Sequence, residues 1–131
     1  MKRDGLKNIL YVEDEPDIRL IATMALESLG GFTLEVCESG VEALAKATAF
    51  GPDLLLLDVM MPGMDGPTTL QALRKLPGLD TVPAVFMTAK VQPQEIAEYH
   101  RLGALDVIAK PFDPMTLAAA VEAIWQRSVR E

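Results

Sequence analysis

Residues 54 to 66 read Leu54-Leu-Leu-Leu57-Asp58-Val-Met-Met-Pro62-Gly-Met-Asp-Gly66, an uninterrupted apolar run that ends in an aspartate and a turn. A half-exposed antiparallel strand would alternate apolar with polar residues, and four consecutive leucines do not. A run this short, bounded by turn residues, is typical of a central strand in a parallel sheet, which is buried on both faces.

Four further apolar runs predict the other strands of this sheet, at residues 9–12, 34–36, 84–87 and 107–109. Between the runs, apolar residues recur at three- and four-residue steps, which predicts helices. Pro16 suits the first turn of the first helix and Gly30-Gly31 its end. The last helix is expected to have Asp113 as its N-cap and Pro114 at its first position. Strands in regular alternation with helices predict an α/β fold, a parallel sheet covered by helices on both faces.

The composition indicates one packed domain. The chain has 131 residues, half of them hydrophobic, and we expect a single domain from residue 7 to residue 129 with no separate output domain. A net charge of −7 without a Lys/Arg cluster argues against direct binding to nucleic acid or to an anionic membrane. The single cysteine, Cys37, cannot form an internal disulfide, and no segment resembles a signal peptide or a membrane span. We therefore expect a cytoplasmic protein.

Chemically distinctive residues follow four of the five predicted strands. Glu13 and Asp14 come after the first run, Asp58 after the third, Thr88 at the end of the fourth and Lys110 after the fifth. Ligands of open parallel sheets bind beyond the carboxyl ends of the strands. Each of these residues alone would suit an ordinary turn or strand end, but together they predict three carboxylates, one hydroxyl and one ammonium at one edge of the sheet.

Such a cluster fits a divalent metal site. Two carboxylates about 4 Å apart repel each other by roughly 1 to 4 kcal/mol, depending on the effective dielectric constant. Magnesium is held by one or two carboxylates, keeps several waters and leaves room for phosphoryl oxygens. Beside such an ion Asp58 can act as a nucleophile and form an acyl phosphate. Lys110 and the Thr88 hydroxyl can then meet the added negative charge.

Four segments, in this order and at this spacing, resemble the receiver domain of two-component signalling proteins: Tyr11-Val-Glu-Asp-Glu-Pro16, Leu57-Asp-Val-Met-Met-Pro-Gly-Met-Asp-Gly66, Met87-Thr-Ala89 and Lys110-Pro-Phe112. The resemblance covers nearly the whole chain, and the second segment is the most specific. It implies a flavodoxin-like, doubly wound (βα)5 fold with strand order 2-1-3-4-5. It also implies a stand-alone phosphoacceptor that works in a two-component or phosphorelay pathway.

The resemblance further implies a role for each acidic residue. Asp58 would be the phosphoacceptor, and Asp14 would coordinate Mg²⁺, or Mn²⁺ in its place. Glu13 would bind the ion through water or as a second ligand. The backbone carbonyl of Met60 would complete the protein's share of the metal site.

The remaining expected roles concern the response to phosphorylation. Lys110 would pair with the phosphoryl group, the Lys110-Pro111 bond would be cis, and Thr88 would move to hydrogen-bond the modified aspartate. The family usually has a Tyr or Phe three residues before this lysine, whose ring turns inward on activation. Here that position is Val107, which puts the usual output switch in doubt.

As implied by the resemblance, the phosphoryl donor is a histidine kinase or a histidine phosphotransfer protein, and the output is contact with a downstream protein target. The chain would not be an enzyme beyond catalysing its own phosphorylation and dephosphorylation. One alternative is a phosphate sink or relay without conformational output. A phosphatase with an aspartyl nucleophile would need a second acid where Met60 stands. A flavodoxin-like binding module would need a Ser/Thr/Gly-rich phosphate loop, where residues 13–15 are all acidic.

Overall fold

The computed structural model describes residues 5–130, with Arg130 described by its backbone alone. It contains one parallel sheet with the strand order β2-β1-β3-β4-β5. The strands are β1 (Asn8–Val12), β2 (Thr33–Cys37), β3 (Leu54–Asp58), β4 (Ala84–Thr88) and β5 (Asp106–Ala109). The predicted fold class and strand order are therefore confirmed.

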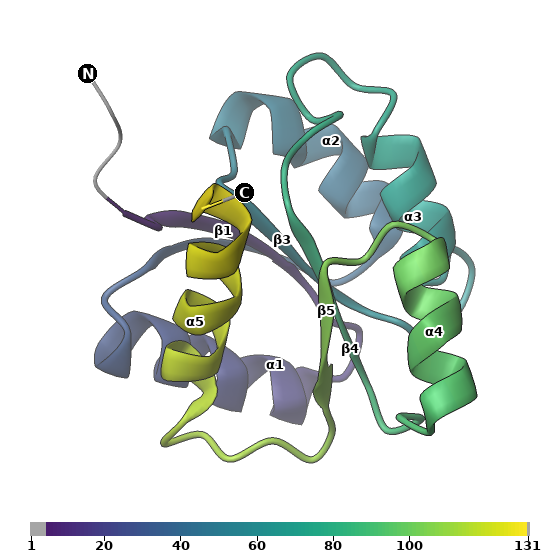
Figure 1. The fold of residues 1–131 in the computed structure, drawn as a ribbon. Helices are drawn as coiled ribbons and strands as arrows, with labels where there is room; N and C mark the ends of the chain where they lie inside the picture. Colours follow the sequence, from purple (N-terminus) through teal and green to yellow (C-terminus); the bar gives the residue numbers. More distant parts are fainter. Residues whose placement is uncertain (1–4, 131) are drawn as a thin grey trace.

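Helices cover both faces of the sheet (Figure 1). One face packs against α1 (Pro16–Met24), its continuation η1 (Ala25–Leu29) and α5 (Leu117–Arg130). The other face packs against α2 (Gly40–Phe50), α3 (Gly66–Leu73) and α4 (Pro93–Arg101). No helix within residues 5–130 is long and apolar enough to cross a membrane.

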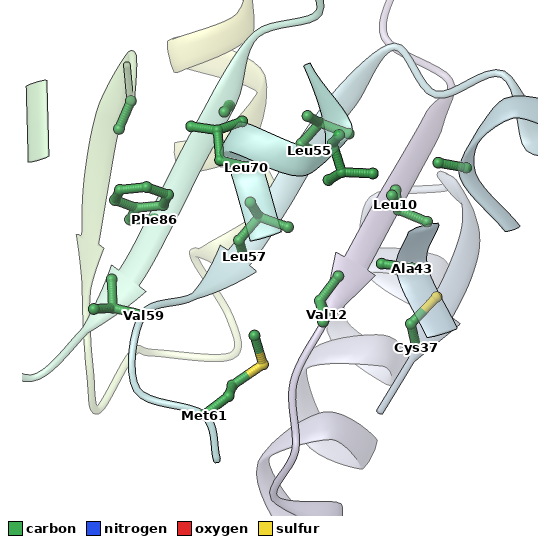
Figure 2. Close-up of a cluster of buried hydrophobic side chains, with 14 of the residues drawn as sticks. Leu10, Val12, Cys37, Ala43, Leu55, Leu57, Val59, Met61, Leu70 and Phe86 are labelled. Carbon is green, nitrogen blue, oxygen red and sulfur yellow. The ribbon is translucent and has the colours of Figure 1, made fainter. Parts of the chain in front are cut away.

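The leucine run of β3 supplies both halves of the core. Leu54 and Leu56 lie in the cluster beneath α1 and α5, whereas Leu55 and Leu57 lie in the cluster beneath α2, α3 and α4. Figure 2 shows the second pair in one cluster with Leu10 of β1. All four leucines are fully buried, and each stabilises the fold by roughly 1.5 to 3 kcal/mol. This central strand fixes the position of the aspartate at its end.

The end of the first helix differs from the expected regular helix. Gly30 ends it, but residues 25–29 form a π-helical turn in which the Gly30 amide donates to the Ala25 carbonyl at 3.2 Å. The apolar spacing did not predict this wider turn, which buries Leu26 in the core and leaves Leu29 exposed.

The predicted start of the last helix is wrong. The Asp113 side chain accepts a hydrogen bond from the amide of Met115 at 2.9 Å, and its carbonyl accepts from the amide of Thr116 at 3.0 Å. These bonds close a separate turn, and α5 begins at Leu117. An aspartate side chain can accept from an amide two or three residues later both in an isolated turn and at a helix N-cap. The presence of Asp113 alone therefore did not distinguish this turn from a helix start.

Candidate functional site

The five chemically distinctive residues lie together at the carboxyl edge of the sheet. Oxygen atoms of Glu13, Asp14 and Asp58 all lie within 4.8 Å of one another. Beside these oxygens lies a pocket of about 190 Å³, lined by residues from four strand ends: Asp14, Glu15, Asp58, Met60, Thr88, Ala89 and Lys110. The edge position predicted from the strand order is thus occupied by every residue that the sequence assigned to it.

Asp58 is held rigidly because the chain on both sides of it is tied to the sheet and to α3. It is the last residue of β3 and is 3% exposed. The next amide, that of Val59, donates to the Met87 carbonyl of β4 at 3.0 Å. Gly66 begins α3 directly against this turn: a Cβ there would lie 2.5 Å from the Asp58 carbonyl oxygen. Only glycine allows the helix to approach the aspartate so closely.

Glu13 is fully buried, and both its backbone amide and its carboxylate contact neighbouring residues. Its amide donates to the Cys37 carbonyl of β2 at 3.0 Å, and its Oε2 accepts from the Glu15 amide at 3.3 Å. Its Oε1 lies 3.0 Å from Lys110 Nζ. Burial raises the pKa of Glu13 to about 7, against the opposing effect of the Lys110 ammonium. Burial thus disfavours the ionised form of this carboxyl, and the Lys110 ammonium favours it.

Lys110 bridges two carboxylates. Its Nζ lies 3.0 Å from Asp58 Oδ1 and 3.0 Å from Glu13 Oε1, and its side chain is 15% exposed. Burial disfavours the ammonium, but hydrogen bonds to Glu13 and Asp58 outweigh that effect and raise the pKa of Lys110. Burial also raises the pKa of Asp58, against the opposing effect of Lys110. The peptide bond from Lys110 to Pro111 is cis, as expected.

Asp14 is the acidic residue that Lys110 does not neutralise. Its Oδ1 is buried and has no hydrogen-bond partner among residues 5–130. An ionised oxygen in that position costs free energy unless a cation or a donor meets it. Together the three acids offer an all-oxygen donor set of the kind that hard divalent cations take. The residues of this edge therefore fit Mg²⁺.

Thr88 and Val107 lie on the α4 side of the site. Thr88 is 1% exposed, lines the pocket, and its Oγ1 accepts a hydrogen bond from the Lys90 amide at 3.1 Å. Val107 is half-buried on β5 and pairs in register with Phe86. The Phe86 ring meets Tyr99 of α4 edge to face, with ring centroids 5.7 Å apart. An aromatic cluster thus exists behind β4, but it is built from β4 and α4 without a β5 ring.

One residue that contacts the site was not among the predicted site residues. Arg19 of α1 donates from Nη1 to the backbone carbonyl of Glu13 at 2.8 Å. In the sequence, only its position early in the helix after the acidic turn pointed to such a contact. That position does not by itself show whether the arginine side chain faces the site or the solvent.

Comparison with known proteins agrees with this geometry. The response regulator receiver domain family matches residues 9–122. The chain is 34% identical over 120 residues to the transcriptional regulatory protein CseB of Streptomyces coelicolor, covering 92% of this chain and 50% of CseB. It is 37% identical over 125 residues to the DNA-binding response regulator MtrA of Mycolicibacterium smegmatis, covering 95% and 53%. The chain spans about half the length of the curated relatives it matches.

Two solved structures resemble this one over nearly their full length. The chemotaxis protein CheY4 of Vibrio cholerae superposes with a TM-score of 0.84 at 30% identity, covering 92% of this chain and 99% of that one. The signal receiver domain of a signal transduction histidine kinase from Syntrophus aciditrophicus gives a TM-score of 0.78 at 32% identity, covering 95% and 94%. With the family match and the strand order, these likenesses show that the chain belongs to the response regulator receiver domain family of two-component systems.

Proposed function

We propose that this chain accepts a phosphoryl group on Asp58 in a Mg²⁺-dependent reaction and signals through changed contacts with other proteins. The observation that carries the proposal is the setting of Asp58. It borders a pocket open to solvent, with two further carboxylates within 4.8 Å and the Lys110 ammonium 3.0 Å from its Oδ1. This arrangement supplies a nucleophile, a cation site and a fixed positive charge in one place.

In the proposed transfer, an oxygen of the Asp58 carboxylate attacks the phosphorus of a phosphohistidine donor. The phosphorus–nitrogen bond breaks, its electron pair leaves with the imidazole, and an acyl phosphate forms on Asp58. Lys110, already 3.0 Å from Oδ1, favours the ionised carboxylate before transfer and offsets the added negative charge afterwards. The pocket is open at its mouth, which leaves the donor a direct approach.

Asp14 and Asp58 would hold the metal directly, Glu13 through water or as a further ligand, and Met60 through its backbone carbonyl. Mg²⁺, or Mn²⁺ in its place, offsets the repulsion between these carboxylates and the oxygens of the arriving phosphoryl group. The unpartnered Asp14 Oδ1 supports the assignment most directly, because no donor among residues 5–130 competes for it.

Thr88 is the proposed link from phosphorylation to output. The Thr88 hydroxyl oxygen accepts a hydrogen bond from the Lys90 amide. After phosphorylation, the hydroxyl could donate its own proton to an anionic phosphoryl oxygen, in a charge-assisted hydrogen bond. Movement of Thr88 would pull on the loop at residues 89–91 and so on α4. Val107 is too short to repeat the inward swing of a Tyr or Phe ring. We therefore place the output in this loop and α4.

Receiver domains are phosphorylated by histidine kinases and act on downstream effectors. For this chain the proposed donor is a histidine kinase or a histidine phosphotransfer protein, the target is a protein, and the location is the cytoplasm. A second candidate function is a phosphate sink or relay without conformational output. It is favoured by Val107, which stands where the family usually has an aromatic residue.

The test uses acetyl phosphate as a small donor and intact-mass spectrometry as the readout. Wild type should gain one phosphoryl group with Mg²⁺ and none in excess EDTA, whereas Asp58→Asn should gain none in either buffer. Asp80→Asn, which removes an exposed carboxylate in the loop after α3, is the matched control and should behave as wild type. Equal labelling of wild type and Asp58→Asn would show that the nucleophile is a different residue.

The two candidate outputs are separated by amide NMR shifts with and without beryllofluoride and Mg²⁺. Conformational output predicts shifts through residues 89–102. Shifts confined to the residues that border the pocket would favour the sink or relay.

A further inference from the structure

We infer that Arg19 is a positioning residue for the metal site: through the Glu13 carbonyl it fixes the direction in which the Asp14 carboxylate points. The inference rests on the proposed function, since that function assigns Mg²⁺ to this edge. Neither the sequence pattern nor the predicted site residues include Arg19.

The contact itself is short and shielded. Arg19 Nη1 donates to the Glu13 carbonyl oxygen at 2.8 Å, and the arginine side chain is 19% exposed. The carbonyl of Glu13 and the amide of Asp14 belong to one planar peptide unit. A hydrogen bond that fixes this carbonyl therefore also fixes the orientation of the peptide plane that contains the Asp14 amide and Cα, and with it the starting direction of the Asp14 side chain.

Asp14 depends on its backbone for orientation more than its neighbours do. Glu13 Oε1 and Asp58 Oδ1 are each 3.0 Å from Lys110 Nζ, so an ammonium holds both carboxylates at their outer ends. Asp14 Oδ1 is buried without a hydrogen-bond partner among the residues described, and Lys110 forms no ion pair with it. No hydrogen bond from a described residue holds that oxygen in place, so its direction depends on the backbone, including the peptide unit that Arg19 holds.

The other contact of Arg19 is weaker. Its Nη2 lies 3.9 Å from Glu38 Oε2, and the Glu38 side chain is 73% exposed. Exposed ion pairs at such distances contribute little. The bond to the Glu13 carbonyl is thus the contact through which Arg19 acts on the site.

Positioning and charge make opposite predictions for magnesium binding, which makes the inference testable. The guanidinium is a positive charge near a cation site, so removing the charge alone would strengthen Mg²⁺ binding. Losing the orientation of a ligand would weaken it, and removing a group that orients a metal ligand typically costs 10- to 100-fold in metal affinity.

The experiment measures the Kd for Mg²⁺ by isothermal titration calorimetry, together with the metal-free unfolding free energy from urea denaturation. Arg19→Met keeps a long apolar stem without a donor, and we expect its Kd to rise about 10- to 100-fold. Arg19→Lys keeps the charge but shortens the reach, so positioning predicts weaker binding than wild type, whereas a pure charge effect predicts no change.

Two matched controls accompany these variants. Glu38→Gln removes only the ion pair at 3.9 Å, and Arg127→Met removes an exposed arginine that pairs with Asp106 on another face. Both should bind Mg²⁺ within about twofold of wild type.

Equal or tighter binding by folded Arg19→Met overturns the inference, even if that variant is less stable, because a merely structural role would lower stability alone. If Arg19→Met does not fold, Arg19→Lys decides: weaker binding supports positioning, and wild-type affinity overturns it. Failure of wild type itself to bind Mg²⁺ would overturn the proposed function and this inference together. Binding by wild type and by both variants alike would overturn only this inference.

Discussion

Replacing Asp14 with asparagine should stabilise the metal-free protein while removing its response to magnesium. The side chain keeps its size, and only its charge and one acceptor change. In the metal-free protein Asp14 lies within 4.8 Å of two other carboxylates, of which the Lys110 ammonium offsets one charge. Asp14 therefore faces about one net negative charge.

The expected gain follows from Coulomb's law. Two unit charges at the upper limit of 4.8 Å repel by about 1 kcal/mol in water and about 3.5 kcal/mol at an effective dielectric constant of 20. Asp14 is half-buried, which favours the lower end of that range. Asp14 also precedes the first turn of α1, where a negative charge contributes about 0.3 to 1 kcal/mol of stability. The net increase in the free energy of unfolding should be about 1 kcal/mol.

The assay is urea denaturation at pH 7.5 in EDTA and again over a series of Mg²⁺ concentrations. For wild type, Mg²⁺ at 100 times its Kd should add about 2.7 kcal/mol, whereas Asp14→Asn should gain little. Asp80→Asn, the exposed control, should follow wild type in both buffers. A fall in metal-free stability of Asp14→Asn, or full stabilisation of that variant by Mg²⁺, would refute the account of Asp14 as an uncompensated metal ligand.

Three further predictions follow from buried groups. The pKa of Glu13 is raised to about 7, so its contribution to metal-free stability is fully present below about pH 4.5. It is lost as the pH rises to about 7, because the folded state holds a proton that the unfolded state has released; urea midpoints in EDTA should fall more steeply over this range in wild type than in Glu13→Gln, which keeps the raised pKa of Asp58. The Tyr11 hydroxyl is buried without a hydrogen-bond partner among residues 5–130, so Tyr11→Phe should raise the unfolding free energy by about 1 kcal/mol, and a loss would reveal a hidden partner. Gly66→Ala would place a Cβ 2.5 Å from the Asp58 carbonyl oxygen and should cost about 1 to 3 kcal/mol and weaken Mg²⁺ binding; Gly5→Ala, with no atom within 4 Å of the added Cβ, is the control.

The strands were the most predictable part of the fold. Each predicted run lies within its observed strand and is at most one residue short at either end. For β3 and β4 the reason is that a fully buried strand is an apolar run bounded by turn or polar residues. Helix ends were less predictable. The turn closed by Asp113 and the π-helical turn at residues 25–29 both depend on which amide each acceptor reaches, and composition does not determine that choice.

Part of the candidate site could likewise be predicted from the sequence, and part could not. The common edge for Glu13, Asp14, Asp58, Thr88 and Lys110 could be predicted because a parallel sheet brings its strand ends together. The double contact of Lys110 and the bond from Arg19 could not be predicted. Both depend on long side chains that reach across loops, and neither reach nor direction follows from spacing along the chain.

The central claim is tested most directly by locating the phosphoryl group on the chain. Wild type is treated with acetyl phosphate and Mg²⁺, then reduced with borohydride, which converts an aspartyl phosphate to homoserine, and its peptides are sequenced by mass spectrometry. The account predicts homoserine at position 58 alone, and none when EDTA replaces Mg²⁺. Homoserine at position 14, or at another aspartate with Asp58 intact, would contradict it.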